Sequence, residues 1–220
     1  MAQMDELIKK DVVDQLYWDD RVDASSVQVA VSEGRVILSG TAANYTARQA
    51  AELDALSIPG VVRVDNQIQH KYVSATPMPP DDEIRAHIEN VLKWNTYVSE
   101  SDITVEVLSG FVTFKGSVDA FWKKDRIEEL ALNILGVMEV NNELAVVPTK
   151  EIADQVIAES VVSALERNSF IDEKSIEVSV ENGQVTLSGN VSDWNVFRTV
   201  YDIALYTPGV TAVVNELSMG

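Results

Sequence analysis

Three copies of one seven-residue pattern run through this chain: Gly34-Arg-Val-Ile-Leu-Ser-Gly40, Gly110-Phe-Val-Thr-Phe-Lys-Gly116 and Gly183-Gln-Val-Thr-Leu-Ser-Gly189. A second pattern keeps the same offsets, 76 residues from the first copy to the second (34 to 110) and 73 to the third (110 to 183). Its members are Gly60-Val61 with Asn66, Gly136-Val137 with Asn142, and Gly209-Val210 with Asn215. Two patterns that share one spacing indicate internal repetition. The chain is therefore predicted to be three copies of one small module.

Each repeat begins with apolar residues three or four positions apart, which is the spacing of one helix face. The predicted faces are Leu7, Ile8, Val12 and Leu16 in the first repeat, Ile84, Ile88, Val91 and Leu92 in the second, and Ile152, Val156, Ile157, Val161 and Leu165 in the third. Acidic residues such as Asp81, Asp82 and Glu83 stand in the first turn, where the helix dipole favours them. Each repeat is therefore expected to open with an amphipathic helix.

Two strands joined by a tight turn are predicted next, because apolar and polar residues alternate with a period of two. In the first repeat Val27, Val29 and Val31 precede a turn at Glu33-Gly34, and Val36 and Leu38 follow it. The third repeat turns at Asn182-Gly183, a strong hairpin signal. A third strand is expected near the end of each repeat, around Val64 and Ile68, Val140 and Leu144, and Val213 and Leu217.

A second helix is expected between the hairpin and the last strand. The third repeat shows its apolar face best, with Val196, Val200, Ile203 and Ala204. The first repeat is weaker, because Asp54 stands where the other copies have Leu130 and Ile203. Each helix is predicted to stop at the glycine of the second repeated pattern, which is Gly60, Gly136 or Gly209.

The fold class that follows is α+β, with three tandem αββαβ modules. Each module is expected to be a three-stranded sheet with two helices on one face, since a sheet with one apolar face needs a cover. The predicted boundaries are 1–72, 80–147 and 149–220. The linker at 74–80 is rich in proline and expected to be extended, whereas the one near Pro148 is only a few residues long. The second and third modules are therefore expected to be the more tightly coupled pair.

These motifs and this element order resemble the BON domain. The resemblance rests on the glycine-flanked hairpin strand and on endings such as Gly60-Val-Val-Arg-Val-Asp-Asn66 and Gly136-Val-Met-Glu-Val-Asn-Asn142. It implies a binding module and not an enzyme, with no cofactor. Members include osmotically induced periplasmic proteins, pore-forming and secretion proteins and a cytoplasmic potassium-binding protein, and many are proposed to contact phospholipid or the cell envelope. This chain differs in having three copies and no LysM-like segment.

Composition restricts the partners and the location. The net charge is −18, from 35 acidic and 17 basic residues, which argues against nucleic acid and against simple adhesion to anionic lipid. There is no cysteine, so disulfides and thiol chemistry are excluded. The beginning of the chain does not read as a secretory signal, and no stretch is apolar enough to span a membrane. The sequence as written predicts a cytoplasmic location, with a periplasmic one as the alternative if the chain is a processed form.

Candidate site residues are few. The glycines Gly34, Gly40, Gly60, Gly110, Gly116, Gly136, Gly183, Gly189 and Gly209 are assigned to turn geometry, and Asn66, Asn142 and Asn215 to backbone hydrogen bonds near strand ends. His70 and His87 lie in different repeats and form no paired ligand pattern, so no metal site is predicted. No catalytic constellation is readable.

The aromatic residues are the candidate binding residues. Tyr45, Phe121 and Trp194 share one position at the start of the second helix, and Trp18 and Trp94 share another at the end of the first. They either cover the small core or form an apolar anchor for a phospholipid surface or a protein partner. Two other functions stay open at this point: binding or sensing of a monovalent cation in the cytoplasm, and a scaffold that self-assembles through its sheet edges.

Overall fold

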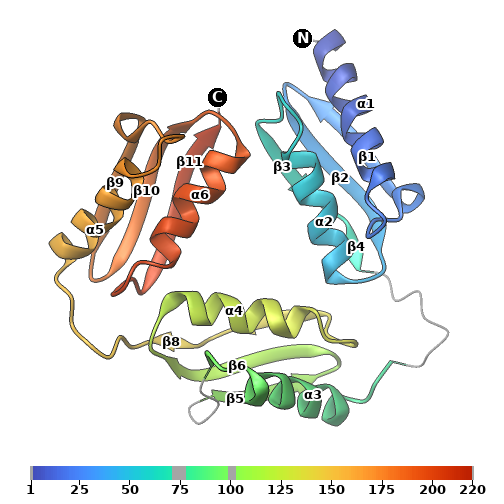
Figure 1. The fold of residues 1–220 in the computed structure, drawn as a ribbon. Helices are drawn as coiled ribbons and strands as arrows, with labels where there is room; N and C mark the ends of the chain where they lie inside the picture. The colour runs from blue at the N-terminus through green and yellow to red at the C-terminus, as the bar shows by residue number, and fades with distance from the viewer. Residues whose placement is uncertain (1, 71–77, 99–102, 220) are drawn as a thin grey trace. The chain divides into compact units, whose positions relative to one another are not determined.

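The computed structural model describes residues 2–70, 78–98 and 103–219, and it contains three modules of one architecture (Figure 1). Module 1 comprises α1 (Ala2–Trp18), β1 (Val27–Ser32), β2 (Arg35–Ala42), α2 (Tyr45–Leu56), β3 (Arg63–Asn66) and β4 (Gln69–His70). Module 2 comprises α3 (Asp81–Trp94), β5 (Ile103–Leu108), β6 (Phe111–Val118), α4 (Phe121–Leu132), β7 (Glu139–Asn142) and β8 (Ala145–Val146). Module 3 comprises α5 (Asp154–Glu166), β9 (Ile176–Glu181), β10 (Gln184–Val191), α6 (Trp194–Leu205) and β11 (Ala212–Met219).

The second strand is central in every sheet. The first strand pairs with it antiparallel through a two-residue turn, so that Ser32 lies opposite Arg35 in module 1. The third strand pairs with it parallel, as Val64 does opposite Val36. Both helices of a module cover the same face of its sheet (Figure 1), which confirms the α+β fold and the αββαβ order. The last strand is in two short pieces in modules 1 and 2, whereas β11 is continuous.

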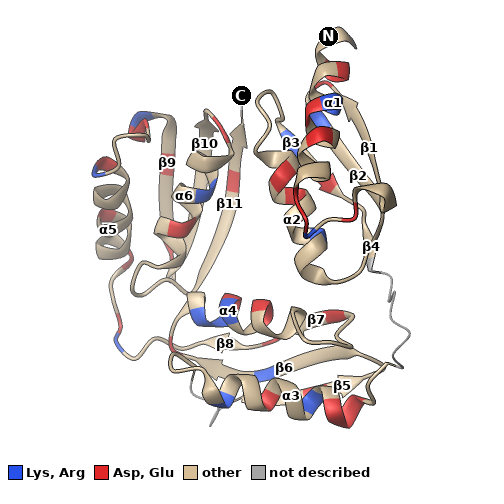
Figure 2. Ribbon diagram, turned by 45° about the vertical axis from the view of Figure 1, so that its right-hand side comes forward, with Lys and Arg blue, Asp and Glu red and all other residues tan. Residues whose placement is uncertain are grey.

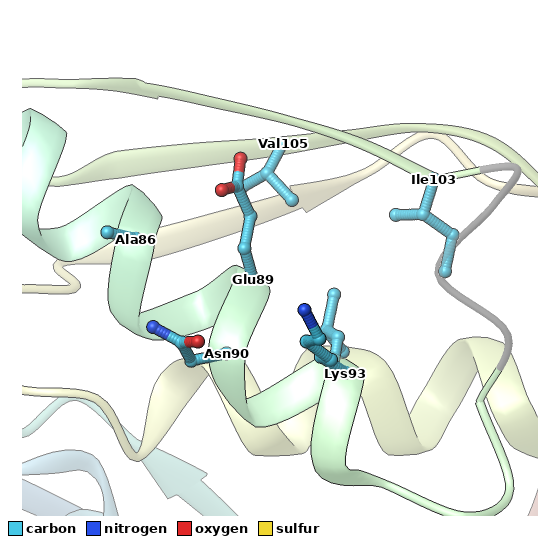
Figure 3. A pocket seen from close by; sticks show the side chains of 7 residues that line it. Ala86, Glu89, Asn90, Lys93, Ile103 and Val105 are labelled. Atoms are coloured by element: carbon cyan, nitrogen blue, oxygen red, sulfur yellow. The ribbon is translucent and has the colours of Figure 1, made fainter.

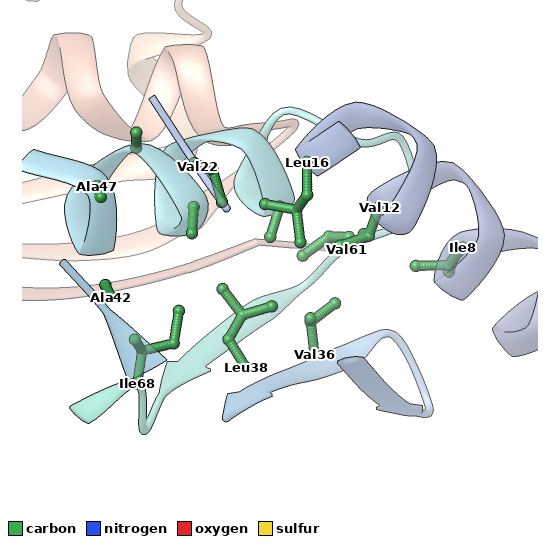
Figure 4. Close-up of a cluster of buried hydrophobic side chains, with 13 residues drawn as sticks. Ile8, Val12, Leu16, Val22, Val36, Leu38, Ala42, Ala47, Val61 and Ile68 are labelled. Atoms are coloured by element: carbon green, nitrogen blue, oxygen red, sulfur yellow. The ribbon is translucent and has the colours of Figure 1, made fainter. Parts of the chain in front are cut away.

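Each module has its own apolar core between helices and sheet. The module 1 core, drawn in Figure 4, joins α1 residues such as Leu16 to Val36 and Leu38 of the central strand and to small residues of α2 such as Ala51. Modules 2 and 3 repeat this arrangement around Phe114 and Leu187 respectively. Module 2 and most of module 3 belong to one compact unit, and module 1 belongs to another that also takes in Ser192–Asn195. Most of the predicted linker 74–80 lies outside the described residues.

The first helix buries a narrower face than the sequence predicted. The buried positions are spaced by four: Ile8, Val12 and Leu16, Ile84, Ile88 and Leu92, and Ile157, Val161 and Leu165. Leu7, Val91 and Val156 are exposed, and Ile152 precedes α5, so their placement on a helix core face was wrong. A small three-stranded sheet gives each helix only one row of contacts, and residues beside that row turn towards water.

The hairpin turns have the geometry of type I′, because both central residues have positive φ. The pairs are Glu33-Gly34, Ser109-Gly110 and Asn182-Gly183. A carboxylate from the first turn of the first helix holds each of them. Asp154, for example, accepts hydrogen bonds from the backbone N–H groups of Asn182 and Gly183, both at 2.8 Å.

Asp5 and Asp81 form the same pair of bonds in their modules, at 2.8 to 3.1 Å. We call this the aspartate clamp; it ties the start of the helix to the hairpin and satisfies two donors of a strained turn. Sequence reasoning missed it. Its signal was an aspartate 29 positions before the turn glycine in each copy, which the equal sequence separations make visible.

The prediction that Gly60, Gly136 and Gly209 end the second helix was wrong. The helices end at Leu56, Leu132 and Leu205, and each glycine lies four residues further on. A Cβ built on Gly136 would lie 2.6 Å from Ile84 Cδ1, and the equivalent atom on Gly209 would lie 3.0 Å from Ile157 Cδ1. These positions therefore require glycine because the first helix packs directly on their backbone, which also has positive φ.

Candidate binding surface

One end of each module brings together the end of the first helix and the start of the second. The first helix is followed by a segment of eight or nine residues that leads to the start of the first strand, and the second helix starts three positions after the central strand ends. Because these two strands are antiparallel, both points lie at the same end of the hairpin, opposite its turn. In module 2 the rings of Tyr97 and Trp122, one from each side of this end, lie 5.9 Å apart in an edge-to-face arrangement.

Large aromatic side chains at this end are exposed to solvent. Trp18 is 84% exposed and Trp94 82%, and in module 3 the loop after α5 presents Phe170 at 86%. Tyr17, which precedes Trp18 in the chain, and Tyr97, three positions after Trp94, are also exposed. We call these five residues the aromatic rim: Tyr17, Trp18, Trp94, Tyr97 and Phe170. Exposed indole and phenyl rings in a recurring position are typical of a surface that binds an apolar partner.

Tyr45, Phe121 and Trp194, the other predicted anchors, are half-buried at the first positions of α2, α4 and α6. Phe121 packs against the core residues of module 3. The adjacent Trp122 lies between Tyr97 and Tyr206, and its ring is 6.3 Å from that of Tyr206. Sequence reasoning missed Trp122, although the aromatic pair Phe121-Trp122 marks the position. These two side chains therefore join modules 2 and 3.

The motif asparagines are bonded to backbone. Asn66 Nδ2 donates to the carbonyl oxygen of Arg48 at 3.0 Å, and Asn66 Oδ1 accepts from the N–H of Ile68. Asn142 repeats both bonds, to Lys124 and Leu144. Asn215 Oδ1 accepts from the N–H of Leu217. In modules 1 and 2 these side chains tie the end of the third strand to the second helix. Their amide groups are already bonded to backbone in place of a ligand.

A shallow pocket of about 370 Å³ lies between α3 and β5 of module 2. Figure 3 shows Glu89, Asn90 and Lys93 on the helix and Ile103 and Val105 on the strand. The described lining residues include no histidine, serine or cysteine. Within the described ranges, no three acidic or histidine side chains are grouped to hold a metal ion. The helices described in the structure include none that is long and apolar enough to cross a bilayer.

The model of the BON domain family matches this chain at residues 4–71, 80–148 and 153–220, once for each module. This chain belongs to the BON domain family. The prediction from the repeated glycine and asparagine motifs is therefore confirmed, and each module is a BON module.

Two relatives have descriptive names. The osmotically-inducible protein Y of Escherichia coli is 24% identical over 62% of this chain and 71% of its own length. The outer membrane lipoprotein DolP of Haemophilus influenzae is 29% identical over 61% of this chain and 72% of its own length. The cytoplasmic location expected from the sequence finds no support in these relatives, one of which is named for the outer membrane.

Among solved structures, the chain is similar to CdsD, a structural protein of the type III secretion system of Chlamydia trachomatis. The alignment covers 98% of this chain and 92% of that one at 17% identity, with a TM-score of 0.27. A TM-score this low means that the two whole chains do not superpose.

Asp54 is a carboxyl group in the core of BON module 1, where it is only 8% exposed. Gln15 Nε2 donates to its Oδ1 at 3.2 Å, and none of the described residues donates to Oδ2. Burial, and then the nearby Asp19 carboxylate, raise the pKa of Asp54 above its ordinary value of 3.8. The same position is apolar in the other two BON modules, so Asp54 is a weakness particular to module 1.

Asp54→Asn is expected to stabilise BON module 1 by about 1 kcal/mol at pH 7 and to have little effect near pH 4, because an unpaired buried oxygen costs roughly this much. The folded module binds the Asp54 proton more tightly than the unfolded chain does. The contribution of Asp54 to folding stability is therefore fully present below pH 3.8 and is lost as pH rises through the raised pKa. The measurement is urea denaturation at several pH values.

The control for this experiment is Asp20→Asn, an exposed carboxyl group in the loop that follows α1. Asp19 acts in the opposite direction, because hydrogen bonds from Arg21 lower its pKa to about 2. The contribution of Asp19 to folding stability is present above pH 3.8 and is lost as pH falls towards 2. This pH range lies below the one in which the Asp54 contribution changes. An Asp54→Asn gain that did not depend on pH would contradict the assignment.

Proposed function

We propose that this chain is a non-enzymatic binding protein of the cell envelope whose aromatic rim contacts the interface of a phospholipid membrane. The observation that supports it most is the recurring exposure of Trp18, Trp94 and Phe170 at the same end of each module. The names of the relatives, an osmotically inducible protein and an outer membrane lipoprotein, favour a role in osmotic or envelope stress. Tyr45 and Trp194 would form the inner, half-buried edge of the same surface.

Rings of this kind prefer the headgroup region, where an indole buries apolar area and keeps its N–H wet. A single ring gives weak attachment, and several on one chain gain by avidity when they reach the membrane together. The net charge of −18 opposes an anionic surface. Binding should therefore be strongest on zwitterionic lipid, and binding to anionic lipid should improve as salt screens the repulsion.

Flotation on phosphatidylcholine vesicles tests the proposal. The Trp18→Ser, Trp94→Ser double variant is expected to lose most of the bound fraction, because each removed ring gives up about 2 kcal/mol or less of apolar burial. Both side chains are exposed, so the variant should keep the melting curve of the parent. The matched control is Val147→Ser, Val156→Ser, which removes two exposed apolar side chains outside the rim.

Vesicles that contain phosphatidylglycerol form the second arm of the flotation experiment. The parent protein is expected to bind them less than neutral vesicles at low salt and to approach neutral binding at high salt. Equal flotation of the rim variant and the parent would refute the aromatic rim as the membrane surface. Binding that falls with added salt would instead show attraction through cationic side chains.

A further inference from the structure

Module 2 has a second exposed apolar surface at its opposite end, where the hairpin turns. Leu108 and Phe111 flank the turn as directly paired residues and are 76% and 52% exposed. Three more apolar side chains of module 2 are exposed, namely Met78, Leu135 and Met138. We call these five residues the turn patch. It lies at the far end of β5 from the aromatic rim, so the two surfaces are separate.

The members of the turn patch gather around Gly110. A Cβ built on this glycine would lie 2.9 Å from both Met78 Cε and Met138 Cγ. The N–H of Met138 donates to the carbonyl oxygen of Gly110 at 2.9 Å. The carbonyl oxygen of Gly136, next to Leu135, lies 2.5 Å from the same built atom. Met78 and Met138 therefore lie at the same turn that Leu108 and Phe111 flank, and Leu135 precedes the glycine whose carbonyl oxygen faces this turn.

The turn patch is particular to module 2. At the positions of Leu108 and Phe111, module 1 has Ser32 and Arg35 and module 3 has Glu181 and Gln184. Met138 corresponds to Val62 and Thr211. The shared fold therefore does not need apolar side chains at the paired turn positions, since two of three copies fold with polar ones there. An apolar cluster that folding does not require is typical of a binding surface.

Acidic side chains surround the turn patch. Asp81 is bonded to the turn itself, Asp82 and Glu83 share its helical turn, and Glu139 lies opposite Phe111 in the sheet. Figure 2 shows the acidic residues on the ribbon where α3 begins. Lys115 is neutralised by Glu106 at 2.7 Å, and Arg85 is one helical turn further along α3.

This charge distribution selects among occupants. A second copy of the chain would bring the acidic residues around one turn patch against those around another, and the two would repel. An anionic membrane would be repelled in the same way. We propose that the turn patch of module 2 binds an amphipathic segment of a partner protein whose apolar face is flanked by lysine or arginine. Leu108 and Phe111 provide the anchors, and the two methionines adapt to side chains of different shape. This binding is independent of the proposed membrane contact.

A synthetic helical peptide of leucine and lysine is the probe, with a leucine and glutamate peptide of the same pattern as its counterpart. Fluorescence anisotropy should show binding of the first and not of the second. Leu108→Ser with Phe111→Gln, residues that modules 1 and 3 use there, should weaken binding about tenfold or more, because two apolar anchors are lost. Neither substitution changes the net charge, so non-specific attraction of the peptide stays constant.

Val156→Ser, which removes an exposed apolar side chain of module 3, is the matched control and should leave peptide affinity unchanged. Equal affinity of the double variant and the parent would overturn the proposal, as would equal binding of both peptides. Self-association or vesicle flotation that the double variant abolishes would assign the patch to a second copy or to lipid instead. The membrane proposal is tested by flotation of the Trp18→Ser, Trp94→Ser variant and the turn patch by peptide binding. Failure of one proposal can therefore be distinguished from failure of the other.

Discussion

Replacing Gly189 by alanine is expected to destabilise module 3 by about 3 kcal/mol or more, the largest effect of any single substitution considered for this chain. Gly189 has φ +125°, outside the region that side chains with a Cβ occupy. A Cβ at this position would lie 2.0 Å from the carbonyl oxygen of Ser175, the residue just before β9 begins. Backbone and not a flexible side chain stands in the way, so the hairpin itself must move.

The measurement is native-state hydrogen exchange of the β9 and β10 amides, because a chain of three modules need not unfold in one step. Glu177→Ala is the control, since this exposed residue lies opposite Ser188 on the same hairpin. Gly40→Ala should reproduce the loss in module 1, where the built Cβ lies 2.1 Å from Ser26 O. A loss below about 1 kcal/mol would mean that the strand can shift at little cost.

Asp81→Ala is expected to cost module 2 about 2 kcal/mol, the second largest effect, through loss of the aspartate clamp. The substitution removes the acceptors of two backbone N–H groups, Ser109 at 2.8 Å and Gly110 at 3.0 Å. The turn keeps its positive φ values but loses the groups that hold it to the helix. Asp81→Asn should cost less, because its single amide oxygen can still accept one of the two bonds.

Asp82→Ala is a close control for this substitution. Asp82 is exposed, stands in the same helical turn and carries the same charge, but it makes no bond to the hairpin. Any helix-dipole contribution is therefore common to both variants, and the difference between them measures the clamp. Equal losses for Asp81→Ala and Asp82→Ala in urea denaturation would show that the clamp adds nothing beyond the dipole.

Much of the architecture could be predicted from the sequence because the same pattern occurs in three copies. The alternation around Val36 and Leu38 and the turn at Asn182-Gly183 are local signals, and their repetition at equal spacing removed the ambiguity of any one copy. The αββαβ order and the family membership follow from these patterns alone. Period-two alternation also predicted which side of each sheet the helices cover.

The tertiary structure decided what the repeated residues do. Gly60, Gly136 and Gly209 looked like helix ends, and the reason they are glycine lies in the first helix, which packs on them from some 50 residues earlier in the chain. The aspartate clamp joins groups 28 and 29 positions apart. Neither relation has a local signature, because each depends on where the helix lies over the sheet.

Exposure was likewise a property of the folded chain. The sequence marked Tyr45, Phe121, Trp194, Trp18 and Trp94 together, and only the fold separates the half-buried first three from the exposed last two. Leu108 and Phe111 are apolar but out of phase with the alternation of Val107 and Val112, and only the structure shows that they are exposed. The sequence by itself therefore determined the repeat, the element order and the family, which depend on neighbours along the chain. The surfaces that could bind a partner were decided by packing, because burial depends on residues that are distant in sequence and close in space.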